Sequence, residues 1–232
     1  MLSTIAIVPC PPVLVPELSG AAAAEIADLT TAALTAAALL PPRWIVIGTG
    51  SADGVVGPDG VGTFAGYGAD VRVRLAPAEP IEPTEPLVDL PLCALIVGWL
   101  RGQARPEASA EVRIHRTDHD SRTAVQLGHR LRTEIDQLPG PVGVLVAADG
   151  ANTLTPSAPG GYDAGSVAVQ RALDDALANG DTAALTRQPA GILGRVAFTV
   201  LAGLAEPGPR SAKELYRGAP YGVGYFAGAW QL

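Results

Sequence analysis

Charged residues are scarce in this sequence, and basic ones scarcer still. Only 17% of the 232 residues are charged, with 16 Lys and Arg against 23 Asp and Glu, and Lys213 is the single lysine. Nucleic acids and anionic membranes are bound through basic surfaces. Because the formal net charge is −7, we expect neither a nucleic acid nor a membrane among the partners of this protein.

Cysteines and long apolar runs are also few. Cys10 and Cys93 are the two cysteines, too few for a disulfide framework, which favours a reducing compartment. No run approaches the roughly 18 apolar residues that a membrane span needs, and prolines interrupt residues 1–20, where a secretory signal would lie. We therefore expect a cytoplasmic protein.

Histidine is nearly absent, with three residues, His115, His119 and His129, all in the second half of the chain. Imidazole is the commonest metal ligand and the usual acid–base group near neutral pH. Its absence from residues 1–114 therefore restricts the metal and proton-transfer chemistry open to this protein. His129 lies opposite the apolar stripe of a predicted helix, so we expect it at the surface.

Apolar segments that alternate between strand and helix patterns fill the rest of the sequence. Short strands are predicted over residues 4–8, 44–47, 70–75, 111–115, 142–147 and 221–230, of which 70–75 has one wet face. Helices are predicted over 20–40, 87–100, 121–138 with Ser121 as its cap, and 191–204, and a further helix is expected to end at Asn179 with Gly180 as a left-handed cap. Residues 48–68 are rich in glycine and are expected to form a long loop, and residues 77–86 to form a proline-rich connection. This order predicts one α/β domain over 1–232, with a central mixed β-sheet and helices on both faces.

Reactive side chains follow several of the predicted strands. Asp149 and Asn152 come after the strand at 142–147, Cys10 after the first strand, and His119 after the strand at 111–115. Ligands gather at the carboxyl ends of parallel strands, so these residues are candidates for a site. Simpler interpretations remain open, because Asp and Asn also satisfy turn amides, a lone cysteine is often a buried apolar residue, and His119 could be a solvated loop residue.

Several stretches together resemble class III extradiol ring-cleavage dioxygenases, the catalytic beta chains related to protocatechuate 4,5-dioxygenase. The segment Pro-Cys-Pro-Pro-Val-Leu-Val-Pro-Glu at 9–17 is similar to their Pro-His-Pro-Pro-hydrophobic-Pro-Glu segment, and residues 149–163 to their Gly-Asp-Leu-Ser-His region. Residues 219–225 look like their closing strand, and Asp118-His119 resembles an Asp-His in the middle of the family. The resemblance runs in order over residues 4–228 and implies an α/β domain like that of the catalytic beta chain, with a pocket at one sheet edge.

The resemblance also implies an Fe(II) site of two histidines and one carboxylate, and this sequence departs from it. Cys10 occupies the first histidine position, and the second falls on Gly50 or Ser51. The glutamate belongs in residues 191–204, which contain no acidic residue. Thiolate is a softer ligand than imidazole, and glycine supplies none. We therefore expect no bound cofactor and no ordinary Fe(II) chemistry.

Part of the polar set implied by the resemblance is retained. The family's acid–base histidine aligns with Asn152, while Asp149 and His119 match polar family positions. A rearranged site that combines Cys10, Asp53, His119 and Asp149 remains an alternative, and such ligands suit zinc.

The sequence thus leads to two main hypotheses, beside a third in which the protein has a structural or assembly role through an apolar surface. The first is a degenerate extradiol-like protein that binds a small ligand, aromatic ligands included, without ring cleavage. The second is an active enzyme with altered metal or cysteine chemistry, in which the catalytic candidates are His119, Asp149 and Cys10. The mean hydropathy of +0.26 is compatible with a homo-oligomer. The predicted pocket residues are Cys10, Gly50, Ser51, His119, Asp149, Asn152 and Tyr162.

Overall fold

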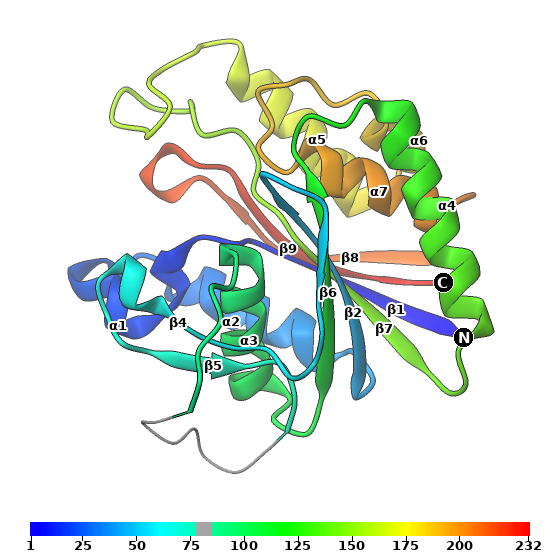
Figure 1. Ribbon diagram of the computed structural model, residues 1–232. Coiled ribbons are helices and arrows are strands. Elements are labelled where there is room, and N and C mark those ends of the chain that lie inside the picture. Colours follow the sequence, from blue (N-terminus) through cyan, green and yellow to red (C-terminus); the bar gives the residue numbers. More distant parts are fainter. Residues whose placement is uncertain (78–84) are drawn as a thin grey trace.

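A mixed β-sheet runs through the middle of the computed structural model, which describes residues 1–77 and 85–232 and, at Ala21 and Ala22, the backbone alone (Figure 1). In this described part the sheet has seven strands in the order β3-β6-β2-β7-β1-β9-β8. Their bounds are β1 Leu2–Val8, β2 Arg43–Gly50, β3 Gly54–Val56, β6 Ser109–Arg116, β7 Val142–Ala147, β8 Ser211–Gly218 and β9 Tyr225–Gln231.

Four neighbouring strands of this sheet run in the same direction. β6 pairs with β2, β2 with β7, and β7 with β1, all in parallel. β3, β8 and β9 are antiparallel to their neighbours. The carboxyl ends of β1, β2, β6 and β7 therefore meet at one edge of the sheet, which we call the carboxyl edge.

Helices cover both faces of the sheet, as the sequence predicts. One face packs against α2 (Ala27–Ala38) and α3 (Leu92–Ala104), and the other against α4 (Ser121–Gln137), α5 (Ser166–Asn179) and α7 (Arg195–Ala205), beside which lies the short α6 (Thr182–Leu185) (Figure 1). Each face has its own apolar core, and the two share one sheet, so the described residues form a single α/β domain. None of the described helices has both the length and the apolar character to cross a bilayer.

The strongest sequence signals lie where they were predicted. All six residues of β7 are buried, which explains the unbroken apolar run at 142–147. Gly180 ends α5 with φ 69°, the left-handed conformation that glycine adopts at low cost. The cap of α4 is Asp120 rather than Ser121: its carboxylate accepts the Thr123 N–H at 2.7 Å.

Other predicted elements are wrong in part. The helix predicted over 20–40 begins only at Ala27 as α2; a 3-10 turn at Gly20–Ala24 takes its start, where Gly20 has φ 50°, and the short α1 (Pro16–Ser19) precedes that turn. The loop at 48–68 contains β3, β4 (Val61–Thr63) and a 3-10 turn at Phe64–Tyr67. β4 pairs with β5 (Arg72–Arg74) in a separate two-stranded sheet. Of the proline-rich connection at 77–86, positions 78–84 lie outside the described residues.

Helices α4 and α7 approach each other closely through two glycines. A Cβ at Gly128 would lie 2.6 Å from the Leu204 backbone nitrogen and still closer to the Val200 carbonyl oxygen. A Cβ at Gly203 would lie 3.0 Å from the Val125 carbonyl carbon. Two atoms cannot approach that closely without a shift, so only glycine fits at these positions.

The first and last strands lie side by side. In the β1–β9 pairing Thr4 stands opposite Gln231, and the Leu232 N–H donates to the Ser3 carbonyl at 3.2 Å. Both ends of the chain therefore lie at the edge opposite the carboxyl edge (Figure 1).

Candidate functional site

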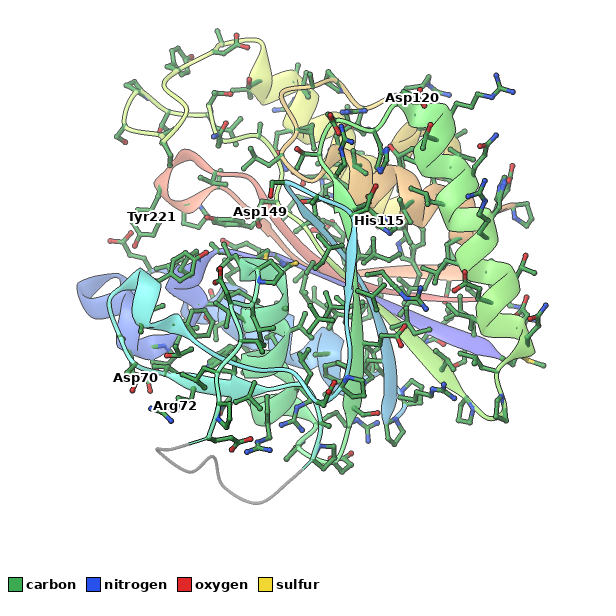
Figure 2. All side chains as sticks on the ribbon, viewed as in Figure 1. Asp70, Arg72, His115, Asp120, Asp149 and Tyr221 are labelled. Atoms are coloured by element: carbon green, nitrogen blue, oxygen red, sulfur yellow. The ribbon has the colours of Figure 1, made fainter. Side chains whose placement is uncertain are left out.

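The carboxyl edge brings Cys10 and Asp149 into direct contact. Cys10 lies two residues beyond β1 and Asp149 two residues beyond β7. Since β1 and β7 are parallel neighbours, both segments leave the sheet at the same place, where Figure 2 labels Asp149. The Cys10 backbone N–H donates to Oδ1 of Asp149 at 2.8 Å. Two of the residues predicted for the site therefore lie together at the carboxyl edge.

A small pocket lies between these two segments. Its volume is about 140 Å³. We call it the strand-end pocket, and it is lined by Cys10, Thr49, Leu92, Cys93, Ala147, Ala148, Asp149, Leu193 and Gly194. Asp149 is the only charged residue among these nine. The pocket therefore combines an apolar wall with a single carboxyl group.

Glycines allow the surrounding elements to approach the strand ends. A Cβ at Gly194 would lie 2.6 Å from Ala148 Cβ, and a Cβ at Gly48 would lie 2.6 Å from Cys93 Sγ. Gly194 directly precedes α7, and Cys93 is in the first turn of α3. Both helices can therefore close on the ends of β7 and β2, which narrows the pocket.

Burial controls the ionisation of the groups in the strand-end pocket. It raises the pKa of Asp149 to about 6, although the hydrogen bond from Cys10 acts in the opposite direction. It raises the pKa of Cys93 to about 11. The pKa of Cys10 is well above its usual range, first through burial and then through the charges of Asp149 and Cys93. Both thiols are protonated near neutral pH, whereas nucleophiles and metal ligands need the thiolate.

Sequence reasoning missed most of the pocket wall. Thr49, Leu92, Cys93 and Leu193 carry no motif, and they meet only because β2, α3 and the segment before α7 converge. Tyr225 at the start of β9 lies beside the same groups: its pKa is raised by burial first and then by the charges of Asp149 and Cys10. Only the order of the parallel strands would have indicated that these segments converge.

His119 is held by a different partner. Its Nε2 lies 2.8 Å from Oδ1 and 3.0 Å from Oδ2 of Asp53, and Asp53 Oδ1 also accepts the Arg116 N–H at 2.9 Å. These contacts lower the pKa of Asp53, with the Arg116 N–H as the largest cause. Within the described residues no contact joins His119 to Cys10 or Asp149, so His119 and Asp149 form no acid–base pair.

The remaining predicted pocket residues do not line the strand-end pocket. Gly50 ends β2, and a Cβ there would lie 2.8 Å from Ile114 Cγ2. Ser51 is exposed. Asn152 lies within its own loop, where its carbonyl accepts the Gly160 N–H at 2.9 Å. Tyr162 is 59% exposed. Gly50 and Ser51 lie at the end of β2 and Asn152 in the loop after β7, outside the lining of the strand-end pocket.

The donor set does not fit the Fe(II) site that the family resemblance implies. The strand-end pocket offers one carboxylate, two protonated thiols and no imidazole. Across residues 1–77 and 85–232 no group of three or more His, Cys, Asp or Glu has an arrangement that could hold a metal ion. The rearranged set also separates into two pairs, Cys10 with Asp149 and His119 with Asp53.

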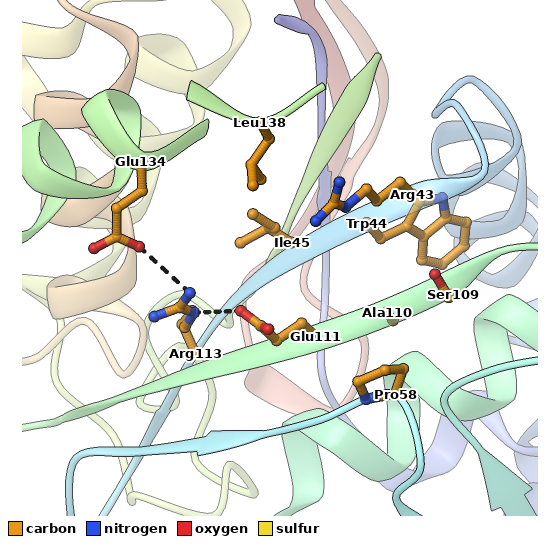
Figure 3. Close-up of a pocket in the computed structure, with 10 residues that line it drawn as sticks. All are labelled: Arg43, Trp44, Ile45, Pro58, Ser109, Ala110, Glu111, Arg113, Glu134 and Leu138. Carbon is orange, nitrogen blue, oxygen red and sulfur yellow. Dashed lines mark hydrogen bonds and ion pairs between the residues drawn. The ribbon is translucent and has the colours of Figure 1, made fainter. Parts of the chain in front are cut away.

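A further pocket of about 270 Å³ lies at the opposite edge of the sheet. It opens beside Arg43 and Ser109, the first residues of β2 and β6 (Figure 3). Its Arg113 is paired with Glu111 at 2.7 Å and with Glu134 at 3.3 Å. Arg113 is therefore shared between two carboxylates, and Arg43, which lines the same pocket, is a further charged group there.

Known proteins resemble this chain in fold. No family model and no curated protein matches the sequence. Among solved structures, the uncharacterized protein JW3007 from Escherichia coli K12 matches with a TM-score of 0.54 at 8% sequence identity, over 98% of this chain and 99% of that one. What the two chains share is the fold. The match agrees with one α/β domain that has a mixed central sheet and helices on both faces.

Proposed function

We propose that this chain is a class III extradiol-dioxygenase-like protein, with a domain like that of the catalytic beta chain, that binds a small ligand in the strand-end pocket and cleaves no ring. The single observation that supports this most is the composition of the pocket: an apolar wall, one carboxyl group and no imidazole. The ordered sequence resemblance supports the family assignment. The missing histidines support the loss of the Fe(II) site.

The size and chemistry of the pocket favour a phenol as the ligand. An apolar protein cavity of about 150 Å³ can hold benzene, and the strand-end pocket has about 140 Å³. Leu92, Leu193 and the alanines would contact the ring. Asp149 Oδ1 accepts the Cys10 N–H, and the carboxylate retains further acceptor capacity for a ligand hydroxyl.

Calorimetric titration with catechol tests this proposal, and benzene, which lacks both hydroxyls, is the apolar comparison. We expect catechol to bind the wild-type protein more tightly than benzene does, and to bind Asp149→Asn at least tenfold more weakly. The matched control is Asp120→Asn, which makes the same chemical change at a helix cap, where Asn caps about as well as Asp. Absence of catechol binding would overturn the binding proposal. Ring cleavage by protein loaded with Fe(II) without oxygen and then exposed to it would overturn the loss of activity.

The alternative, an enzyme that uses Cys10, is favoured by one observation, the contact between Cys10 and Asp149. That contact involves the backbone N–H and not the thiol. Cys10→Ala keeps the N–H and removes the sulfur, so it separates the two functions. An enzyme would lose its turnover or metal content in this variant, whereas a binding protein would retain its affinity for catechol within about twofold.

The expected location and assembly are proposals of the same kind. The chain is proposed to act in the cytoplasm, and self-association into a homo-oligomer is proposed from its apolar composition. Light scattering coupled to gel filtration measures the mass in solution, and a mass of 23.6 kDa at micromolar concentration would contradict the oligomer.

A further inference from the structure

A third pocket lies beside the loop that follows β7. It has a volume of about 350 Å³ and opens between α5, the end of β8 and the loop that follows β7. We call it the α5 pocket, and it is lined by Leu154, Thr155, Val167, Gln170, Arg171, Asp174, Arg217, Gly218 and Ala219.

The floor of the α5 pocket contains two buried polar side chains. Gln170 is 6% exposed and Asp174 is 8% exposed. Gln170 Nε2 donates to Oδ1 of Asp174 at 2.8 Å, and Gln170 Oε1 accepts the Ala151 N–H at 2.8 Å. No hydrogen bond to Oδ2 of Asp174 is found in the described part of the chain. Asp174 Oδ2 is not one of the buried atoms without a partner, so it faces the pocket, where a ligand donor can reach it.

The neighbouring charges leave Asp174 without an ion pair. Arg217 lines the same pocket, but its Nε donates to Glu214 at 2.8 Å and its NH1 to Asp175 at 2.7 Å. Arg171 is exposed and makes no ion pair with any residue that the structure describes. The pocket therefore presents one unpaired carboxyl group and one unpaired guanidinium group.

We propose that the α5 pocket binds a small zwitterion of the α-amino-acid class, with its ammonium group on Asp174 and its carboxylate on Arg171. Residues three apart on a helix face have Cβ atoms about 5–6 Å apart. The ammonium and carboxylate of an α-amino acid are separated by a single carbon, so one molecule reaches both side chains. Leu154 and Val167 supply an apolar wall for its side chain.

The ionisation of Asp174 agrees with this assignment. Burial raises its pKa to about 6, and the charges of Glu214 and Asp175 act in the same direction, while Gln170 and Arg217 oppose them. Near neutral pH the carboxyl group is therefore mostly ionised but poorly compensated. A bound ammonium group supplies the opposite charge and a donor, and its attraction to the carboxylate is stronger here than in bulk water because the effective dielectric constant is lower.

Three matched probes test the proposal by calorimetry near neutral pH. They are L-leucine, which carries both charges, isopentylamine, which lacks the carboxylate, and 4-methylpentanoate, which lacks the ammonium group. We expect L-leucine to bind and each of the other two to bind at least tenfold more weakly. Equal binding of isopentylamine and L-leucine, or no binding of L-leucine, would overturn the proposal.

Two variants locate the binding site. Asp174→Asn and Arg171→Gln should each weaken L-leucine binding at least tenfold, and Asp120→Asn and Arg122→Gln are the matched controls at α4. Arg171 is exposed, so its variant should fold even where Asp174→Asn does not, and circular dichroism checks both. Unchanged L-leucine affinity in Arg171→Gln would overturn the assignment. The catechol titration involves a different pocket, so the two proposals fail separately.

Discussion

The backbone N–H of Cys10 donates to the carboxylate of Asp149 at 2.8 Å, across 139 positions of the chain. This bond joins the segments that leave β1 and β7 at the carboxyl edge. It holds one oxygen of Asp149 in place while the carboxyl group stays at the wall of the strand-end pocket. The bond therefore orients the one charged group that this pocket has.

Replacing Asp149 with Asn should change how stability depends on pH. The pKa of Asp149 is about 6 in the folded chain and about 3.9 when unfolded. Between these values the folded form holds more protons, so this group's contribution to stability falls as pH rises through that window. Each pKa unit corresponds to about 1.4 kcal/mol of stability, and solvent reaches part of this group, which reduces the effect. We therefore expect the free energy of unfolding of Asp149→Asn, measured relative to that of the wild type, to rise by about 1–2 kcal/mol between about pH 4 and pH 7.

Denaturant unfolding at several pH values measures this difference. Asp120→Asn should show no such gain, because the Thr123 N–H lowers the pKa of Asp120. If the difference in unfolding free energy between the wild type and Asp149→Asn stayed constant with pH, this would contradict the raised pKa of Asp149.

Both cysteines should react slowly with alkylating reagents in the folded protein. Cys10 is 8% exposed and Cys93 3% exposed, and the pKa of each thiol is raised. Because the thiolate is the reactive form, we expect iodoacetamide near neutral pH to modify each at least about 100-fold more slowly than free cysteine. Mass spectrometry follows the reaction, and the chain unfolded in denaturant, where both thiols should react, is the control. Rapid modification of Cys10 would favour the enzyme alternative.

Gly128→Ala should destabilise the protein strongly. Its Cβ would lie 2.6 Å from the Leu204 nitrogen and closer still to the Val200 carbonyl, so α4 and α7 must separate. Forcing atoms into a packed interface costs about 1–3 kcal/mol and sometimes more, and we expect about 3 kcal/mol here. The matched control is Gly102→Ala on α3, which is exposed and has no atom within 4 Å of the new Cβ. Gly102→Ala should stabilise α3 by about 0.5–1 kcal/mol. Equal changes in stability for the two variants would contradict the close approach of α4 and α7 at Gly128.

Gln170→Ala should cost more stability than a typical polar substitution. It removes the acceptor of the Ala151 N–H and the donor to Asp174, both buried. An unsatisfied buried group costs about 1–3 kcal/mol, so we expect a loss of about 2–4 kcal/mol in denaturant unfolding. Gln188→Ala removes one half-buried bond to the Ala184 carbonyl and should cost less than about 1 kcal/mol. A smaller loss for Gln170→Ala than for Gln188→Ala would show that the buried amide is dispensable.

The sequence predicted the central part of the fold because central strands are buried on both faces. Residues 142–147 are apolar throughout and form β7. β8 was missed because it lies at the sheet edge, pairs only with β9 and carries charged residues such as Lys213 and Glu214. β3 was missed because its three residues lie in a glycine-rich stretch and depend on pairing with β6.

The same limits apply to the site. Cys10 and Asp149 were both predicted at strand ends, and the parallel pairing of β1 and β7 brings them together. The sequence grouped His119 and Asp53 only within a larger set that included Cys10 and Asp149; that these two pair with each other depends on the return of the chain through β3. The burial of Asp174 was not predictable either, because it depends on the edge strand β8, which contacts α5 and was itself missed.

The adjacency of Thr4 and Gln231 in β1 and β9 has a practical consequence for handling the protein. A tag, a fluorophore or a solid support joined to either end leaves the molecule from the side away from both Cys10 and Asp149. Immobilisation through either end therefore presents the strand-end pocket to the bulk solution. A short peptide bridge between the ends would also give a circular chain with its pocket unobstructed.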